Sequence, residues 1–228
     1  MMTFGYRVPK EIGDGIVIKF FPQFRGYYWV FPRTCHASFG ICGRLSQHTT
    51  QTLKDLLHSF LTETGQAPDT DRMGDWPVYS ALIPSLRPES LRTNRIAGEN
   101  WSLVGDAGGF ADPITCEGIY YALRSGDLLA QALIEGSATS YPERCHTDFA
   151  ADFTHAAEMF EKFYTGDFLG SDFITRMVQA SSRSAALRSI MNAFVAGRQD
   201  YRSLRTTLLR KCLRIGLEIA ASAFRSSR

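Results

Sequence analysis

The chain has 228 residues, 44% of them hydrophobic, with 25 Lys and Arg against 23 Asp and Glu. This composition excludes a disordered or fibrous chain, and the length suffices for one large domain or two small ones. The five cysteines form no CxxC pair, which argues against a structural zinc site or a disulfide framework and favours a reducing compartment. The chain opens without a signal peptide and contains no apolar run of the ~20 residues that cross a bilayer, so a cytoplasmic protein is expected.

The first third of the chain is predicted to form strands. Three short runs rich in β-branched and aromatic residues, spaced as in an antiparallel meander, are Gly15–Phe21, Gly26–Pro32 and His36–Gly43. Thr49–Thr64 is predicted to be a helix that stops at Gly65, and the residues at the spacing of its apolar face are Leu53, Leu56, Leu57, Phe60 and Leu61. A further strand is expected around Val78–Pro84.

The second half of the chain is predicted to be mostly helical. An extended run, Trp101–Val104, leads into a glycine-rich loop, and Gly118–Ile134 follows as a helix. From Tyr141 onward the pattern is helical throughout, with breaks near Gly166–Gly170, Ser181–Ser184 and Gly197. A sheet-rich first part followed by helices predicts an α+β fold.

The most informative segment is the strand–loop–helix unit WSLVGDAGGFADPITCEGIYYALRSGDLLA, residues 101–130. An acid at the end of a strand, Asp106, can accept hydrogen bonds from a polyol. The helix that opens near Gly118 presents free N–H groups, which can hold an electron-rich oxygen or a phosphate. Gly108 and Gly109 let the backbone pass close to a ligand. The unit therefore indicates a binding site for a polyol or phosphate group.

This unit resembles the second flavin-binding motif, GDAxGxxxPxxGxGIxxAxxxGxxLA, of p-hydroxybenzoate hydroxylase-like flavoproteins, nearest to the geranylgeranyl reductase branch. The resemblance implies FAD as cofactor, with Asp106 at the ribityl chain and Pro113 at the isoalloxazine ring. The cofactor-binding residues that it implies are Gly105, Asp106, Ala107, Gly108, Pro113, Gly118 and Ile119. Members of this branch often have glycine where this chain has Cys116, whose thiol we expect to pack rather than react.

A second match lies in the run GYYWVFP, residues 26–32. Tyr27, Trp29 and Phe31 alternate along a predicted strand and therefore share one face. Such a face is more often core than pocket, but the run also matches the YxWxFP motif of geranylgeranyl reductases, in which this sheet forms a wall of the prenyl cavity. The resemblance implies an apolar substrate such as a prenyl lipid, held by Tyr27, Trp29, Phe31 and Pro32.

Together these matches predict an antiparallel substrate-domain sheet, the C-terminal part of a Rossmann-like FAD-binding domain, and a helical C-terminal region. The expected division is 1–100 for the substrate-domain sheet with one helix, 101–136 for the second FAD-binding motif, and 137–228 for the helical region. Relatives open with a strand–GxGxxG–helix unit that is absent here. The chain is thus expected to be N-terminally truncated and, by itself, to bind FAD weakly or not at all.

The activity that the resemblance implies is reduction of double bonds in an isoprenoid or similar apolar substrate, with NAD(P)H as the electron donor to FAD. The alternatives are a flavin monooxygenase or halogenase, and an inactive remnant or lipid-binding module. The cofactor carries the chemistry, so no catalytic side chain is assigned. The histidines show no metal-ligand spacing, so no metal is expected, and no nucleic-acid motif is present.

The C-terminal end is basic. From Arg183 to Arg228 there are ten Lys or Arg residues against Asp200 and Glu218. Such an end is typical of a solvated helix face or of peripheral contact with an anionic membrane surface. The tail lacks the Trp- and Phe-rich face of many interfacial helices, which favours the solvated face.

Overall fold

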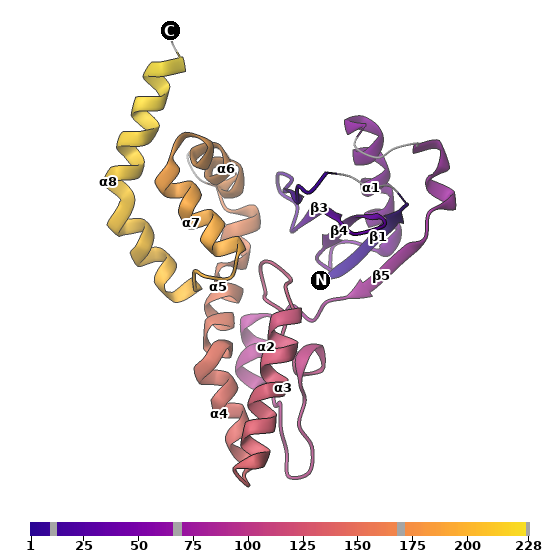
Figure 1. Ribbon diagram of the computed structural model, residues 1–228, viewed down its shortest axis with the longest axis vertical. Coiled ribbons are helices and arrows are strands. Elements are labelled where there is room, and N and C mark those ends of the chain that lie inside the picture. The colour runs from indigo at the N-terminus through magenta and orange to yellow at the C-terminus, as the bar shows by residue number, and fades with distance from the viewer. Residues whose placement is uncertain (10–12, 66–69, 168–171, 227–228) are drawn as a thin grey trace. The chain divides into compact units, whose positions relative to one another are not determined.

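The computed structural model describes residues 1–9, 13–65, 70–167 and 172–226. The chain divides into two compact units, Met1–Ile83 and Pro84–Arg228, and each is described by itself. The first unit is an antiparallel sheet with one long helix, and the second is built of helices around a glycine-rich loop (Figure 1). The predicted α+β class is confirmed.

Five antiparallel strands form the sheet of the first unit. They are β1 (Met2–Val8), β2 (Val17–Lys19), β3 (Gly26–Pro32), β4 (Ala37–Gly43) and β5 (Val78–Leu82), in the spatial order β2-β3-β4-β1-β5. The predicted meander corresponds to β2, β3 and β4. β1 was not predicted as a strand, yet it lies between β4 and β5 and pairs with both.

One face of the sheet packs against α1 (Thr50–Thr64), as Figure 1 shows. The Thr49 side chain caps the helix by accepting a hydrogen bond from the Thr52 amide, 3.1 Å, and Gly65 ends it in the left-handed region with φ +59°. The helix buries most of its predicted apolar face, but Leu56 stays 43% exposed. Alternate strand residues complete this core, among them Phe4, Tyr6, Tyr28, Val30, Phe39 and Ile41.

The second unit consists of helices and, between α2 (Pro88–Thr93) and α3 (Ile119–Ile134), a long irregular segment that contains the GDAG turn. The helices that follow are α4 (Tyr141–Cys145), α5 (Ala151–Thr165), α6 (Phe173–Arg183), α7 (Ala185–Val195) and α8 (Tyr201–Ser226), with a π-helical turn at His146–Ala150 between α4 and α5. The predicted breaks are confirmed at Gly166, Ser184 and Gly197, while residues 168–171 lie outside the described part.

The prediction that Ser102–Val104 forms a strand is wrong for the described chain. Val104 has an extended backbone, but this segment makes only a single bridge, between Ala97 and Ser102. The Leu103 amide donates to the Ile96 carbonyl, and the Leu103 carbonyl accepts from the Tyr141 hydroxyl. An extended segment becomes a strand only beside a partner strand, and none of the described segments of this unit provides one.

Candidate functional site

The GDAG sequence forms a tight turn that lies against the helix α3. Residues Gly105–Gly108 make one 3-10 turn, with Gly105 at φ +53° and Gly109 at φ +76°, a region that favours glycine. A Cβ at Gly105 would lie 3.0 Å from the Cβ of Ala122 on α3. The Gly105 amide also donates to the Ser125 hydroxyl on α3, at 2.9 Å. The glycines thus let the turn approach the helix closely.

This turn places the Asp106 carboxylate at the N-terminus of α3. The side chain is exposed, and a Cβ at Gly118 would lie 3.2 Å from its Oδ1 atom. Within the described residues the carboxylate makes no hydrogen bond. The first turn of α3 offers backbone N–H groups, of which that of Tyr120 donates to the Glu117 carboxylate at 2.8 Å. An exposed acceptor and a helix N-terminus therefore stand side by side.

The loop that follows is held by a buried carboxylate. Asp112 is only 4% exposed, and its Oδ1 atom accepts hydrogen bonds from the amides of Ile114 and Thr115, both at 2.8 Å. The Tyr201 hydroxyl, at the start of α8, lies 2.8 and 2.9 Å from the two carboxylate oxygens. Burial raises the pKa of Asp112, while hydrogen bonds from Thr115 and Tyr201 oppose that rise. Tyr164 of α5 also donates to the Ile114 carbonyl, at 2.6 Å.

These contacts connect the helical region to the predicted flavin-binding loop. The predicted division places the flavin-binding loop and the helical region in separate parts. The structure joins them through Asp112 and Tyr201, which are 89 residues apart in the chain. The aspartate beside a proline was a visible signal, but nothing in the sequence singles out Tyr201 as its partner. Pro113 itself is buried beneath this network, whereas Ala107 and Ile119 are exposed.

Cys116 occupies a conformation that suits glycine better than cysteine. Its φ is +59°, one of two positive φ values among the described non-glycine residues. A side chain in this region is strained against the backbone, whereas glycine has no Cβ to clash. This gives a physical reason why glycine would suit this position better than cysteine. The thiol is half-buried.

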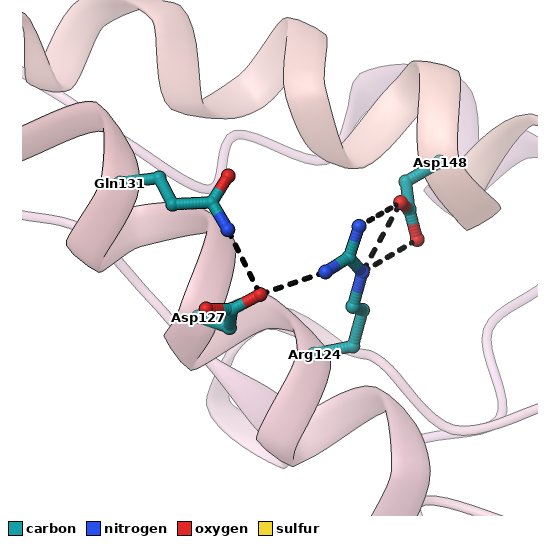
Figure 2. Close-up of polar contacts among 4 residues, drawn as sticks. All are labelled: Arg124, Asp127, Gln131 and Asp148. Atoms are coloured by element: carbon teal, nitrogen blue, oxygen red, sulfur yellow. Dashed lines mark hydrogen bonds and ion pairs between the residues drawn. The ribbon is translucent and has the colours of Figure 1, made fainter. Parts of the chain in front are cut away.

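A polar cluster joins α3 to the π-helical turn, as Figure 2 shows. The Arg124 guanidinium donates to both oxygens of Asp148, with a shortest distance of 2.6 Å, and to Asp127 at 2.7 Å. Gln131 donates to the same oxygen of Asp127, at 3.0 Å. Hydrogen bonding to Asp148 raises the pKa of Arg124 further, so the guanidinium stays charged. The cluster aligns α3, and with it the turn that carries Asp106, on the neighbouring helices.

A cavity of about 670 Å³ lies between the loop that contains Asp112 and the connection from α7 to α8. Asp112, Thr115 and Glu117 line it together with Asp148 and residues of the α7–α8 connection, Ala196–Asp200. None of the predicted flavin contacts lines this cavity. The cavity is therefore distinct from the surface on which the Asp106 side chain is exposed.

In the first unit, the aromatic residues predicted from GYYWVFP share the sheet face opposite α1. The ring centroids of Tyr27 and Trp29 are 5.8 Å apart, and those of Trp29 and Phe31 are 5.9 Å apart. Trp29 is 8% exposed, and Tyr27 and Phe31 on either side of it are half-buried. Strand alternation places Pro32 on the other face, beside Ala37 in the register.

Two glycines, Gly5 and Gly40, leave space on the sheet surface that the rings of Tyr79 and Trp29 occupy. The strand register aligns Trp29, Gly40, Gly5 and Tyr79 in one row across β3, β4, β1 and β5. A Cβ at Gly40 would lie 2.3 Å from Cζ2 of Trp29, and a Cβ at Gly5 would lie 2.4 Å from the Tyr79 ring. Both rings therefore lie directly over bare backbone.

Hydroxyl groups tie the two rings together. Ser38 and Tyr79 share a hydrogen bond of 2.7 Å, and the Trp29 indole N–H lies 3.4 Å from the Ser38 oxygen. We call Tyr27, Trp29, Phe31 and Tyr79 the aromatic wall. Tyr79 was not predicted as a site residue, since only the register of β1 and β5 brings it beside Gly5. The wall and the flavin-like loop belong to different units.

The described residues contain no group of three or more His, Cys, Asp or Glu side chains placed to hold a metal ion. None of the helices described here combines the length and the hydropathy that crossing a membrane requires.

Comparisons with known proteins agree with the motif. No family model matches the chain. Geranylgeranyl diphosphate reductase from rice is 32% identical over 138 residues, which cover 60% of this chain and 26% of that protein. Tryptophan 2-halogenase from Chondromyces crocatus is 28% identical over 180 residues, which cover 73% of this chain and 31% of that protein. The chain thus spans about a quarter to a third of the length of these relatives.

Among solved structures, a geranylgeranyl bacteriochlorophyll reductase-like protein from Thermoplasma acidophilum superposes with a TM-score of 0.62 and 19% identity. The match covers 97% of this chain and 54% of the other, which shows that the two share a fold. The predicted resemblance to the geranylgeranyl reductases is confirmed: the chain is related to them in sequence over more than half its length.

Proposed function

We propose that this chain is part of an FAD-dependent oxidoreductase that reduces double bonds of an isoprenoid or similar apolar substrate. The observation that carries the proposal is the Asp106 carboxylate, exposed and without a hydrogen-bond partner in the described chain, beside the N-terminus of α3. It stands in a loop whose sequence matches the second flavin-binding motif. The relationship to geranylgeranyl diphosphate reductase supports the same assignment.

The residues present fit the ring-side half of a flavin. Asp106 would accept hydrogen bonds from ribityl hydroxyls, and Gly105 and Gly108 keep side chains away from that path. The amides at Gly118 and Ile119 would face the pyrimidine side of the ring, where an α-helix N-terminus favours negative charge. Pro113 would line the ring. When bound and reduced, the flavin supplies the hydride, and NAD(P)H is the proposed electron donor.

The aromatic wall would hold the apolar substrate. The rings of Trp29 and Tyr79 lie directly over Gly40 and Gly5, and the Tyr79 hydroxyl bonds to the Ser38 hydroxyl beside the wall. Such a surface recognises shape and buried area, at about 0.8 kcal/mol per methylene, rather than polar groups. A prenyl chain fits this chemistry better than a polar substrate does.

A second candidate is oxygen-dependent flavin chemistry, as in a flavin monooxygenase or halogenase. The match to a tryptophan halogenase over 180 residues favours it, because the same loop can serve either reaction. The two are separated by products: a reductase yields a saturated isoprenoid without oxygen, whereas a halogenase consumes oxygen and incorporates halide. A lipid-binding remnant would retain neither flavin nor turnover.

Asp106→Ala is the direct test. With this chain fused behind the GxGxxG unit of a geranylgeranyl reductase, the substitution should raise the Kd for FAD about tenfold to a hundredfold. A buried ribityl hydroxyl would lose a charge-assisted acceptor worth about 1.5–3 kcal/mol. Flavin fluorescence quenching measures the Kd. Glu99→Ala, which removes another exposed carboxylate of the same unit, is the matched control and should leave it unchanged. If a folded Asp106→Ala variant bound FAD as tightly as the unsubstituted protein, Asp106 would not be a ligand of the ribityl chain.

A further inference from the structure

The long C-terminal helix α8 leaves a row of leucines uncovered. Leu209, Leu213 and Leu217 are 61%, 81% and 73% exposed, and their spacing of four residues places them on one face of the helix. Gly216 and Ala220 are also exposed and complete the strip. We call Leu209, Leu213, Gly216, Leu217 and Ala220 the leucine stripe.

The opposite face of α8 attaches the helix to the rest of the unit, beside α7 (Figure 1). Leu204, Leu208 and Ile215 on that face are partly buried. The Glu218 carboxylate accepts hydrogen bonds from the Ser184 hydroxyl at 2.7 Å and from the Ala186 amide at 3.0 Å. Packing of α8 therefore does not use the leucine stripe.

Positive charge flanks the stripe. At 100° per residue, Arg210 and Arg214 lie on one side of Leu213 and Arg205 lies on the other. Glu218 is the single acid between Tyr201 and Ser226, and it bonds to Ser184 and Ala186 with one carboxylate oxygen and to Arg214 with the other. Arg214 is paired with Glu218, at 2.8 Å, whereas Arg205 and Arg210 make no ion pair within the described residues. The exposed face of α8 thus combines apolar side chains with an arginine on each edge that no carboxylate neutralises.

We propose that this face binds the surface of an anionic lipid bilayer. Leucines can enter the boundary between headgroups and acyl chains, while flanking arginines reach the lipid phosphates with their long side chains. Each basic residue near such a surface adds attraction that salt screens. The sequence alone had favoured a solvated face, because it could not show that the leucines are left uncovered.

A second copy of the chain fits this face less well. Leu209, Leu213, Gly216 and Ala220 do have the alternating spacing of four and three that paired helices use, but the glycine and the alanine would bury little apolar surface in such a pair. Two copies would also bring arginines of like charge together. Bilayer binding does not depend on flavin, so it is separable from the proposed function. If both hold, the face would bring the enzyme to the membrane that holds a prenyl substrate.

Vesicle co-sedimentation of the 228-residue chain tests the proposal. Vesicles of phosphatidylcholine containing about one third phosphatidylglycerol should bind at least about tenfold more tightly than phosphatidylcholine alone, and about 1 M NaCl should abolish the difference. Leu213→Asp should weaken binding about tenfold or more. Ile134→Asp, at a position 86% exposed on α3, is the matched control and should bind like the wild type.

The charge contribution is tested separately, in a variant that leaves the leucines intact. Arg205→Gln with Arg210→Gln should weaken binding about twentyfold, whereas Arg87→Gln with Arg95→Gln should not. Circular dichroism confirms that each variant is folded. Absence of wild-type binding to anionic vesicles, or equal binding by Leu213→Asp, overturns the proposal. So does a concentration-dependent dimer that Leu213→Asp dissociates, since the face would then join two copies.

Discussion

Replacing Asp112 by alanine is expected to lower the free energy of unfolding of the second unit by about 3–5 kcal/mol. The substitution leaves the amides of Ile114 and Thr115 and the hydroxyl of Tyr201 without their acceptor, in a site where the carboxylate is only 4% exposed. Each buried donor left unpaired costs about 1–3 kcal/mol. Urea unfolding followed by circular dichroism measures the loss.

Two conservative variants distinguish the hydrogen bonds from the volume of the side chain. Asp112→Asn keeps an acceptor oxygen, and Tyr201→Phe removes one hydroxyl, so each should cost only about 1–2 kcal/mol. If Asp112→Ala were no less stable than Tyr201→Phe, the loop would not depend on the carboxylate.

The pH dependence gives a further check. Burial raises the pKa of Asp112 in the folded chain, so the folded state holds its proton more tightly than the unfolded state does. This contribution to stability is therefore present at low pH and is lost as pH rises from the ordinary aspartate pKa through the raised one. Asp112→Asn should remove this component, which unfolding curves measured across that range would reveal.

Gly40→Ala is expected to destabilise the first unit by about 2–3 kcal/mol, an unusually large effect for one added methyl group. The new Cβ would lie 2.3 Å from the Trp29 ring and 2.7 Å from the Tyr79 hydroxyl, so both side chains would have to move away from the sheet. Tryptophan fluorescence should report the displaced indole, and urea unfolding should report the lost stability.

Gly15→Ala is the matched control, because a Cβ there meets nothing within 4 Å. A double-mutant cycle then assigns the cause: in a Trp29→Ala background, where the ring is absent, Gly40→Ala should cost much less. A Gly40→Ala variant as stable as the wild type would contradict the close packing of ring on glycine. Because the wall is the proposed substrate surface, the same substitution should also weaken binding of long apolar ligands.

The sequence predicted those features that depend on residues close together in the chain, such as helix ends and the faces of strands. Thr49 and Gly65 mark the ends of α1, because capping groups and a left-handed glycine act within one turn of the helix. The alternation of Tyr27, Trp29 and Phe31 predicted their shared face, because side chains in a strand alternate with a period of two. In the glycine-rich GDAGGF loop, Gly105 and Gly109 have the positive φ that glycine tolerates best, while the close approach of Gly108 and Gly109 to a ligand stays a prediction.

What tertiary structure decided were the contacts between residues far apart in the chain. The position of β1 between β4 and β5 brings Gly5 under Tyr79, and no local pattern encodes that register. Tyr201 meets Asp112 across 89 residues because α8 returns to the loop. Ser102–Val104 makes only a single bridge despite its strand-like sequence, because a strand requires a neighbouring strand for its backbone hydrogen bonds. The leucines of α8 have the spacing of a buried face, yet α8 packs through its other side. Helical periodicity shows which residues share a face, and only the packed chain determines which face is covered.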